Sequence, residues 1–145
     1  MTATTVPDWT QSTDSWGDHY GCGYTFAVAA ADQTGALLVT LDDPSREGPL
    51  EDTELSRDQW EGEVRLGESL FANWCTDVRG SDGPEVESRW PITSGSVTVL
   101  SVPDEQCDGG TATIAVRDLV ANTPEGDVHL PDSVISSDRW GCFPG

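Results

Sequence analysis

Two neighbouring segments near the start of the chain alternate apolar residues with polar or small ones. The alternating apolar positions are Tyr24, Phe26, Val28 and Ala30 in the segment 19–31, and Leu37, Val39 and Leu41 in the segment 36–41. A period of two places one apolar row on one face of a half-buried strand. Residues 32–35 read Asp-Gln-Thr-Gly, which favours a turn. The pattern therefore predicts a hairpin of two strands.

Further short segments carry the same signal along the rest of the chain. The predicted strands are 63–66, 69–75, 85–92, 96–102, 111–121, 128–130 and 134–140, separated by stretches rich in Gly, Pro, Asp and Ser. The period slips at Asp118, Leu119 and Val120, which predicts a β-bulge. Residues 42–58 are acidic and interrupted by Pro and Gly, so we expect a loop there. Ser56 and Gln59 have the spacing of a capping box, which indicates one helical turn ending near Trp60.

Seven to nine short strands without a long helical pattern predict an all-β protein. The fold expected is an antiparallel β-sandwich, Ig-like or similar and stapled by disulfides, with a partly open barrel as the alternative. We expect residues 1–17 to be a polar N-terminal tether and residues 18–145 to be a single β-sandwich domain. No segment has the length and hydropathy of a transmembrane span. Residues after Met1 lack the character of a signal peptide, so the tether is expected to follow a removed export signal or lipid-anchor segment.

Charge narrows the classes of partner. The chain has 26 acidic residues against 7 basic ones, all of them Arg, for a net charge of -19. Such a surface repels nucleic-acid phosphates and anionic lipid, so we expect neither as a partner.

Calcium is the one metal that the acidic pairs favour, although none forms an EF-hand and solvated acidic turns are the simpler interpretation. No cofactor is predicted. The acidic pairs are Asp42 with Asp43, Glu51 with Asp52, and Asp104 with Glu105 near Asp108.

The four cysteines are Cys22, Cys75, Cys107 and Cys142, spaced too widely for a haem-attachment or thioredoxin-type motif. His19 with Cys22 resembles half of a zinc site, but the second half is missing. Structural disulfides are therefore predicted, together with an extracytoplasmic location. Sequence alone allows three pairings. We favour Cys22 with Cys142, because that pair ties the two ends together, and Cys75 with Cys107, which brackets the central strands.

Residues 70–142 resemble a group of exported or lipid-anchored actinobacterial proteins of unknown function. The resemblance is carried by Cys75-Thr76-Asp77-Val78, Trp90 followed by residues 94–99, a lone Cys107 before a Thr-Ala-Thr strand, Leu130-Pro131-Asp132, and Trp140-Gly141-Cys142. It implies export, disulfides and a β-domain. It transfers no catalytic or binding residue.

Six tryptophans are many for a chain of 145 residues. Trp74 and Trp90 lie on strand patterns and are expected in the core or packed against a disulfide. Trp9, Trp16 and Trp60 lie in polar, acidic segments, where exposed rings would suit stacking on sugars or anchoring a protein partner. These three are the candidate ligand-binding residues, although they could equally cover one end of the sandwich.

The one possible Ser-His-Asp triad in the sequence would use His129 with Asp127 and Ser133. No nucleophile-elbow motif accompanies these residues. No catalytic residue is assigned. The function predicted is an extracytoplasmic, non-catalytic β-sandwich that binds a partner or forms a structural module at the cell surface. A carbohydrate-binding module using the three tryptophans and a small secreted hydrolase are the alternatives. The first needs exposed rings, and the second needs His129 in a concave pocket.

Overall fold

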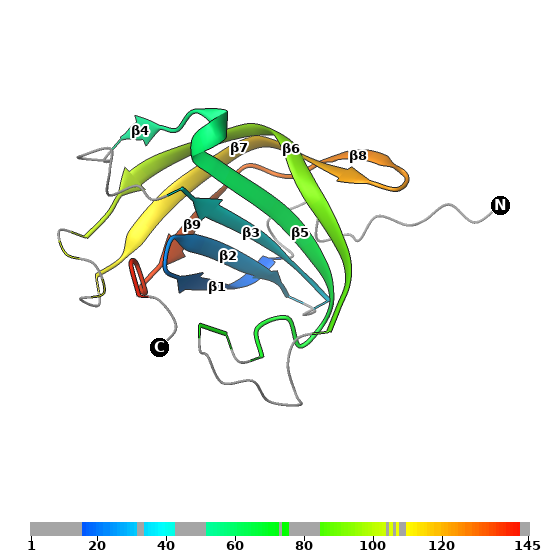
Figure 1. Cartoon of the computed structure of the whole chain (residues 1–145), viewed down its shortest axis with the longest axis horizontal. Helices are drawn as coiled ribbons and strands as arrows, with labels where there is room; N and C mark the ends of the chain where they lie inside the picture. The colour runs from blue at the N-terminus through cyan, green and yellow to red at the C-terminus, as the bar shows by residue number, and fades with distance from the viewer. Residues whose placement is uncertain are drawn as a thin grey trace.

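The computed structural model describes residues 16–31, 34–42, 52–72, 74–75, 85–103, 105, 107 and 110–142. Within this part of the chain nine strands form one antiparallel sheet (Figure 1). The strands are β1 (Trp16–Cys22), β2 (Thr25–Ala30), β3 (Gly35–Leu41), β4 (Thr53–Glu54), β5 (Trp60–Glu68), β6 (Glu85–Ser101), β7 (Ala112–Thr123), β8 (Gly126–His129) and β9 (Ser133–Ser137). The predicted all-β antiparallel class is confirmed.

The main path through the sheet is β1-β2-β3-β5-β6-β7-β8, while β4 pairs with β6 and β9 pairs with β7. All strands are thus joined by hydrogen bonds into one sheet, which does not by itself divide into the two packed sheets of a sandwich. The described residues contain no helix long and apolar enough to cross a membrane. Trp16 and Gly17, placed in the tether by sequence, belong to β1, and residues 1–15 lie outside the described part.

The hairpin predicted from residues 19–41 is confirmed between β2 and β3, where Val28 pairs with Leu37. The prediction of one strand over 19–31 was wrong, because the chain turns at Gly23, whose φ of 59° lies in the left-handed region. Two strands, β1 and β2, therefore stand where one was expected. The predicted single turn of helix is present as a 3-10 helix, η4 (Arg57–Gln59), and the Ser56 N–H donates to Gln59 Oε1 at 2.8 Å.

Strand β6 is the longest element and bends from one half of the sheet to the other (Figure 1). Its first residues pair with β5 up to Pro91, and pairing with β7 begins at Ile92. Proline has no N–H to donate, so it fits the point where the strand changes partner. Gly95, with a φ of 126°, and Asp118, with a φ of 54°, then interrupt the ladder between β6 and β7. The bulge predicted at Asp118 is confirmed.

The two ends of the sheet approach each other where β1 meets β9. Gly23 forms an isolated parallel bridge with Trp140. The Ser136 N–H donates to His19 Nδ1 at 3.1 Å, so a side chain supplies a hydrogen bond that a regular ladder would take from the backbone. Gly21 is buried, and a Cβ at this position would overlap with the side chain of Ser137. The missing side chain lets β1 lie against β9.

The inner face of the curled sheet holds the main core. Its fully buried side chains come from six strands, β2, β3, β5, β6, β7 and β9: Phe26, Val28, Leu37, Val39, Val64, Val97, Val99, Ile114, Val116, Leu119 and Ile135. A smaller apolar cluster lies on the outer face, where Ala27, Ala36 and Leu38 are covered by Leu70. The outer face is therefore partly covered by chain that follows β5, and this covering segment bounds the candidate site.

Candidate functional site

The two disulfides lie close together, but their pairing differs from the one favoured on sequence. Cys22 is bonded to Cys75, and Cys107 is bonded to Cys142. The prediction that all four cysteines form disulfides is confirmed, whereas the preferred pairing was wrong. The reason is that residues 69–72, 74 and 75 fold back over β1 and bring Cys75 to Cys22. A zinc site at His19 and Cys22 is excluded, because Cys22 has no thiolate to offer.

The segment 69–75 was expected as a strand, and that expectation was wrong. Ser69 and Cys75 have positive φ angles, 53° and 56°, and the Ala72 N–H donates to the Ser69 carbonyl at 2.9 Å. These are features of turns rather than of extended chain. The turns place two aromatic rings, Phe71 and Trp74, on the outer face of the sheet. We call residues 69–72, 74 and 75 the covering segment.

Three aromatic rings fix the position of the covering segment. Tyr20 of β1 stacks on Phe71 at a centroid distance of 3.8 Å, and Trp74 meets Phe71 edge-on at 4.9 Å. Trp74 Nε1 donates to the Gly21 carbonyl at 3.0 Å. Together with the Cys22–Cys75 bond, these contacts hold Trp74 as a rigid wall beside β1 and β2.

The outer face next to this wall is organised in cross-strand rows. One row runs Cys22, Thr25, Thr40 and Glu61 across β1, β2, β3 and β5. The next row contains Leu38 paired with Glu63, and the third contains Ala36 paired with Arg65. Side chains at alternate positions share a face, so the polar residues of β5 line up along the strand. The floor is thus made of two threonines and a leucine, with charged groups on the far side.

The charged side is a linked set of three residues. Arg65 and Arg89 pair directly across β5 and β6, an arrangement in which two like charges repel. Glu63 lies between them: its carboxylate accepts from Arg65 Nη2 at 3.1 Å and from Arg89 Nη1 at 3.1 Å. The Arg89 side chain is 55% exposed, so these ion pairs stabilise the fold little. Their effect is to fix the orientation of the three side chains.

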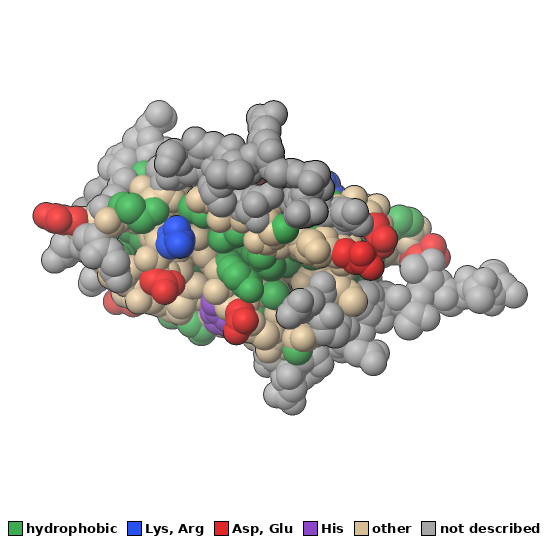
Figure 2. All heavy atoms as spheres, turned by 90° about the horizontal axis from the view of Figure 1, so that it is seen from below, with side chains coloured by type: hydrophobic (Ala, Val, Ile, Leu, Met, Phe, Trp, Pro, Cys, Tyr) green, Lys and Arg blue, Asp and Glu red, His purple; other side chains and the backbone are tan. Residues whose placement is uncertain are grey.

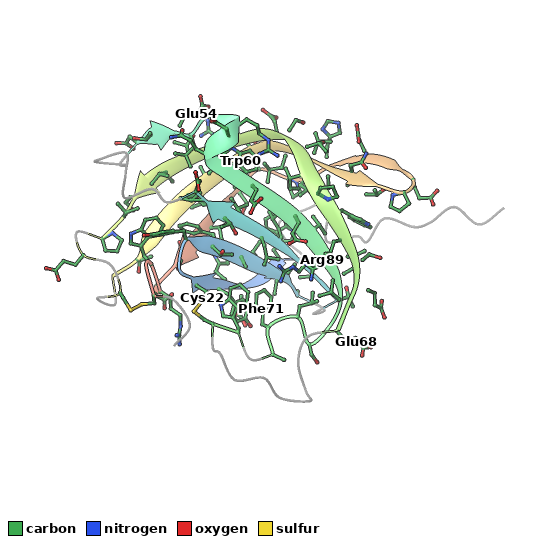
Figure 3. All side chains as sticks on the ribbon, viewed as in Figure 1. Cys22, Glu54, Trp60, Glu68, Phe71 and Arg89 are labelled. Atoms are coloured by element: carbon green, nitrogen blue, oxygen red, sulfur yellow. A yellow bond between two sulfur atoms is a disulfide. The ribbon has the colours of Figure 1, made fainter. Side chains whose placement is uncertain are left out.

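Between the wall and the charged side lies a groove of about 610 Å³. Its walls include Trp74 and the Cys22–Cys75 bond on one side and Glu61, Glu63 and Arg89 on the other, and Thr25, Thr40 and Leu38 form its floor. Figure 3 shows Cys22 and Phe71 at the covering segment and Arg89 on the β6 side. Figure 2 shows apolar side chains gathered in the middle of the lower face, with acidic groups around them. Protein cavities that bind small ligands have volumes of roughly 300–1,000 Å³.

The candidate tryptophans do not meet at this groove. Trp60 is only 3% exposed and packs in the main core, where Arg57 lies 4.2 Å from its ring centroid. The exposure that a sugar-stacking role required is therefore contradicted for Trp60, because inner-face packing outweighs the polar context of its neighbours. Trp16 is partly buried against the same core, and Trp9 lies outside the described residues.

Sequence reasoning missed the residues that do line the groove. Trp74 was expected in the core or against a disulfide, and it does pack on the outer apolar cluster, but its place in the groove wall was not predicted. Glu61, Glu63, Arg65 and Arg89 were not singled out. One signal was present, since residues 61, 63 and 65 alternate with Gly62 and Val64. Alternation shows that the three share a face, but only the register with β3 and β6 shows what lies opposite them.

The other chemical candidates do not assemble in the described part of the chain. His129 is exposed on β8, and Asp127 accepts a hydrogen bond from Asn122 rather than from His129. His129 is not among the described residues lining the cavities at Trp74, at Trp60 and at Leu70. Among the calcium candidates, Asp42, Asp52 and Glu105 are described, while Asp43, Glu51, Asp104 and Asp108 are not. The described residues contain no group of three or more metal-ligating side chains.

Comparisons with known proteins add no relative. No protein-family model, no curated protein and no solved structure matches the chain. Two disulfides in a chain of this size are typical of an oxidising, extracytoplasmic environment. The function must therefore be inferred from the groove, from the Cys22–Cys75 bond that lines it, and from the second disulfide.

Proposed function

We propose that the protein is an extracytoplasmic, non-catalytic β-domain, secreted or lipid-anchored at the cell surface, that binds a ligand in the groove between Trp74 and Arg89. The observation that carries this proposal is the groove itself. It combines an apolar wall with a few converging polar groups, which is the usual composition of a ligand site.

The groove is organised before any ligand arrives. The Cys22–Cys75 bond and the ring contacts of Trp74 fix one wall, and Glu63 fixes the guanidinium groups of the other. Side chains that are already ordered lose little entropy on binding, so such a site favours affinity. A purely structural module would not require a hollow lined by ordered polar groups on its outer face.

A non-catalytic role is supported by the partners of the groove hydroxyls. Thr25 Oγ1 and Thr40 Oγ1 are hydrogen-bonded to each other at 2.8 Å, and no histidine is among the described residues that line the groove. A threonine nucleophile needs a base within hydrogen-bond reach. The hydrogen-bond partner of each hydroxyl is the other hydroxyl, which is not a base, and this favours a role in holding a ligand.

The ligand hypothesis is tested by titrating the oxidised, ¹⁵N-labelled protein with four classes of compound: neutral oligosaccharides, acidic oligosaccharides, small amines and short peptides. At least one class is expected to shift the backbone amide signals of Thr40, Glu61 and Glu63. Thr113 and Ser136, a hydroxyl pair joining β7 and β9, serve as reference positions away from the groove. Unchanged groove signals with all four classes would contradict the proposal.

A groove-filling variant tests the site without knowledge of the ligand. Thr40→Phe places a ring on the floor beside Leu38 and is expected to abolish binding by whichever class binds. Thr113→Phe is the matched control, because Thr113 is also a half-buried outward residue of a central strand. Equal loss of binding in both variants would point to a general disturbance of the sheet and would count against the groove.

The extracytoplasmic assignment has its own test. Protein isolated from its native cells under alkylating conditions is expected to contain no alkylated cysteine, because all four are in disulfides. Fractionation should place it outside the cytoplasm. Alkylation of all four thiols in a cytoplasmic fraction would overturn this part of the proposal and leave ligand binding to be judged separately.

A further inference from the structure

The wall of the groove formed by Trp74 and the Cys22–Cys75 bond offers carbon and sulfur surface to a ligand. The polar atom of the Trp74 ring, Nε1, donates to the Gly21 carbonyl at 3.0 Å, so it is already used within the protein. Phe71 and Tyr20 support the ring from the covering segment and from β1. A ligand that meets this wall must therefore present an apolar face to it.

The floor and the far side of the groove offer both hydrogen-bond donors and hydrogen-bond acceptors. The Thr25–Thr40 pair uses one hydroxyl hydrogen internally and leaves one O–H donor and several lone pairs. Glu61 is exposed at the end of the same row and contributes acceptors, whereas Arg89 contributes donors. An anion needs donors alone and a cation needs acceptors alone. A mixture of both suits hydroxyl groups, each of which donates and accepts.

The formal charge of the groove also favours a neutral ligand. Glu61 and Glu63 against Arg65 and Arg89 give the groove a formal charge of zero, although the whole chain carries -19. An anionic ligand would have to approach against the field of the protein, and a cationic ligand would meet two guanidinium groups at the site. A neutral ligand meets neither obstacle.

Resting on the proposed function, we infer that the groove binds a neutral carbohydrate. The C–H face of a sugar ring would lie on Trp74, and its hydroxyls would reach the Thr25–Thr40 pair, Glu61 and Arg89. The row from Thr25 to Glu61 crosses two inter-strand spacings, about 10 Å, which is enough for one or two sugar rings. This places the sugar against Trp74 instead of Trp9, Trp16 and Trp60.

The experiment titrates the oxidised full chain with cellotetraose, xylotetraose, maltotetraose and mannotriose as neutral probes, and with tetragalacturonate, choline and spermidine as charged ones. We expect at least one neutral probe to shift the amide signals of Thr40 and Glu61. Its affinity should stay within twofold between 0.05 and 0.5 M NaCl, because salt screens charge interactions and the probe has no charge.

Two variants locate the hydroxyl contacts. Thr40→Val removes one groove hydroxyl and should weaken binding of the neutral probe about tenfold, whereas the matched Thr113→Val should leave it unchanged. Glu61→Gln keeps the shape of an exposed side chain, so it tests the acceptor even where Thr40→Val affects folding. Glu61→Gln should lower the affinity for the neutral probe several-fold. Thermal unfolding of each variant separates lost binding from lost structure.

The class of probe that binds separates the carbohydrate inference from the proposed function. Binding of only tetragalacturonate, or of only choline or spermidine, with a steep salt dependence would overturn the carbohydrate inference and leave the groove as a ligand site. A neutral sugar that shifts signals only outside the groove would also overturn it. Failure of every probe, together with failure of the peptides used above, would overturn both this inference and the proposed function.

Discussion

Gly23 and Cys142 are hydrogen-bonded neighbours: the Gly23 N–H donates to the Cys142 carbonyl oxygen at 2.7 Å. In the same exchange the Gly141 N–H donates to the Gly23 carbonyl at 2.9 Å. The Sγ atoms of Cys75 and Cys22 lie 3.4 and 3.8 Å from the same Cys142 oxygen. The turn between β1 and β2, the chain after β9 and the covering segment therefore meet at one point, with both disulfides around it.

The disulfide pairing can be read directly from a tryptic digest. The chain has no lysine, and its seven arginines place the four cysteines in four separate peptides. Without reduction, the peptide of Cys22 is expected to be linked to that of Cys75, and the peptide of Cys107 to that of Cys142. Mass spectrometry of the linked peptides checks this. A link between the peptides of Cys22 and Cys142 would show that the favoured sequence pairing is the native one.

Removing the Cys22–Cys75 bond should release the wall of the groove. The bond closes a loop of 53 residues, so Cys22→Ser with Cys75→Ser is expected to lower the free energy of unfolding by up to about 4 kcal/mol. In the folded fraction the Trp74 indole N–H should exchange faster, because the covering segment is no longer tied to β1. Cys107→Ser with Cys142→Ser is the matched control, which should lower stability without speeding that exchange. Equal exchange in the two variants would contradict a separate role for the wall.

Alternation along the chain predicted most of the strands, because inward residues such as Phe26 and Leu37 recur at every second position. It nevertheless merged β1 with β2 and placed a strand at 69–75. It was insufficient for the site. Thr40 and Glu61 are adjacent only because β3 pairs with β5 in one register, and a shift by one residue would separate them. Trp74 was misplaced because its segment has a strand-like composition but turns at Ser69 and Cys75. The pattern of apolar residues predicts neither the register between strands nor a positive φ at a non-glycine residue. The contacts that depend on these two features could therefore not be predicted.

Gly21 should tolerate no side chain. A Cβ there would overlap with the Cβ and Oγ of Ser137, which is buried and fixed in β9. Gly21→Ala is therefore expected to cost about 1–3 kcal/mol of unfolding free energy, as for other overpacked sites, measured by urea denaturation. Gly17→Ala in the same strand is the control, since its nearest neighbour would be 3.4 Å away. Adding Ser137→Gly should recover much of the loss. Equal stability of the two alanine variants would argue against the close approach of β1 to β9.

Arg57 joins η4 to the sheet through two hydrogen bonds from one guanidinium group, a geometry that lysine cannot reproduce. Its Nη1 and Nη2 donate to the carbonyls of Trp60 and Ile92, each at 2.7 Å. Arg57→Lys keeps the charge but has a single amine, so it should lose at least one of these bonds and about 1–3 kcal/mol of stability in urea denaturation. Arg117→Lys, at an exposed position of β7, should change stability by less than about 0.5 kcal/mol. Similar effects from both variants would mean that only charge matters at Arg57.

His19 supplies a side-chain acceptor where β1 meets β9. Because its Nδ1 accepts from the Ser136 N–H at 3.1 Å, His19→Ala should leave that amide to water and speed its hydrogen exchange. The stability loss should be about 0.5–1.5 kcal/mol, the usual contribution of one hydrogen bond. His129→Ala, which removes the exposed imidazole of β8, should leave exchange at Ser136 unchanged. If Ser136 exchanges at the same rate in both variants, the backbone near Gly23 and Trp140 alone holds the two ends of the sheet together.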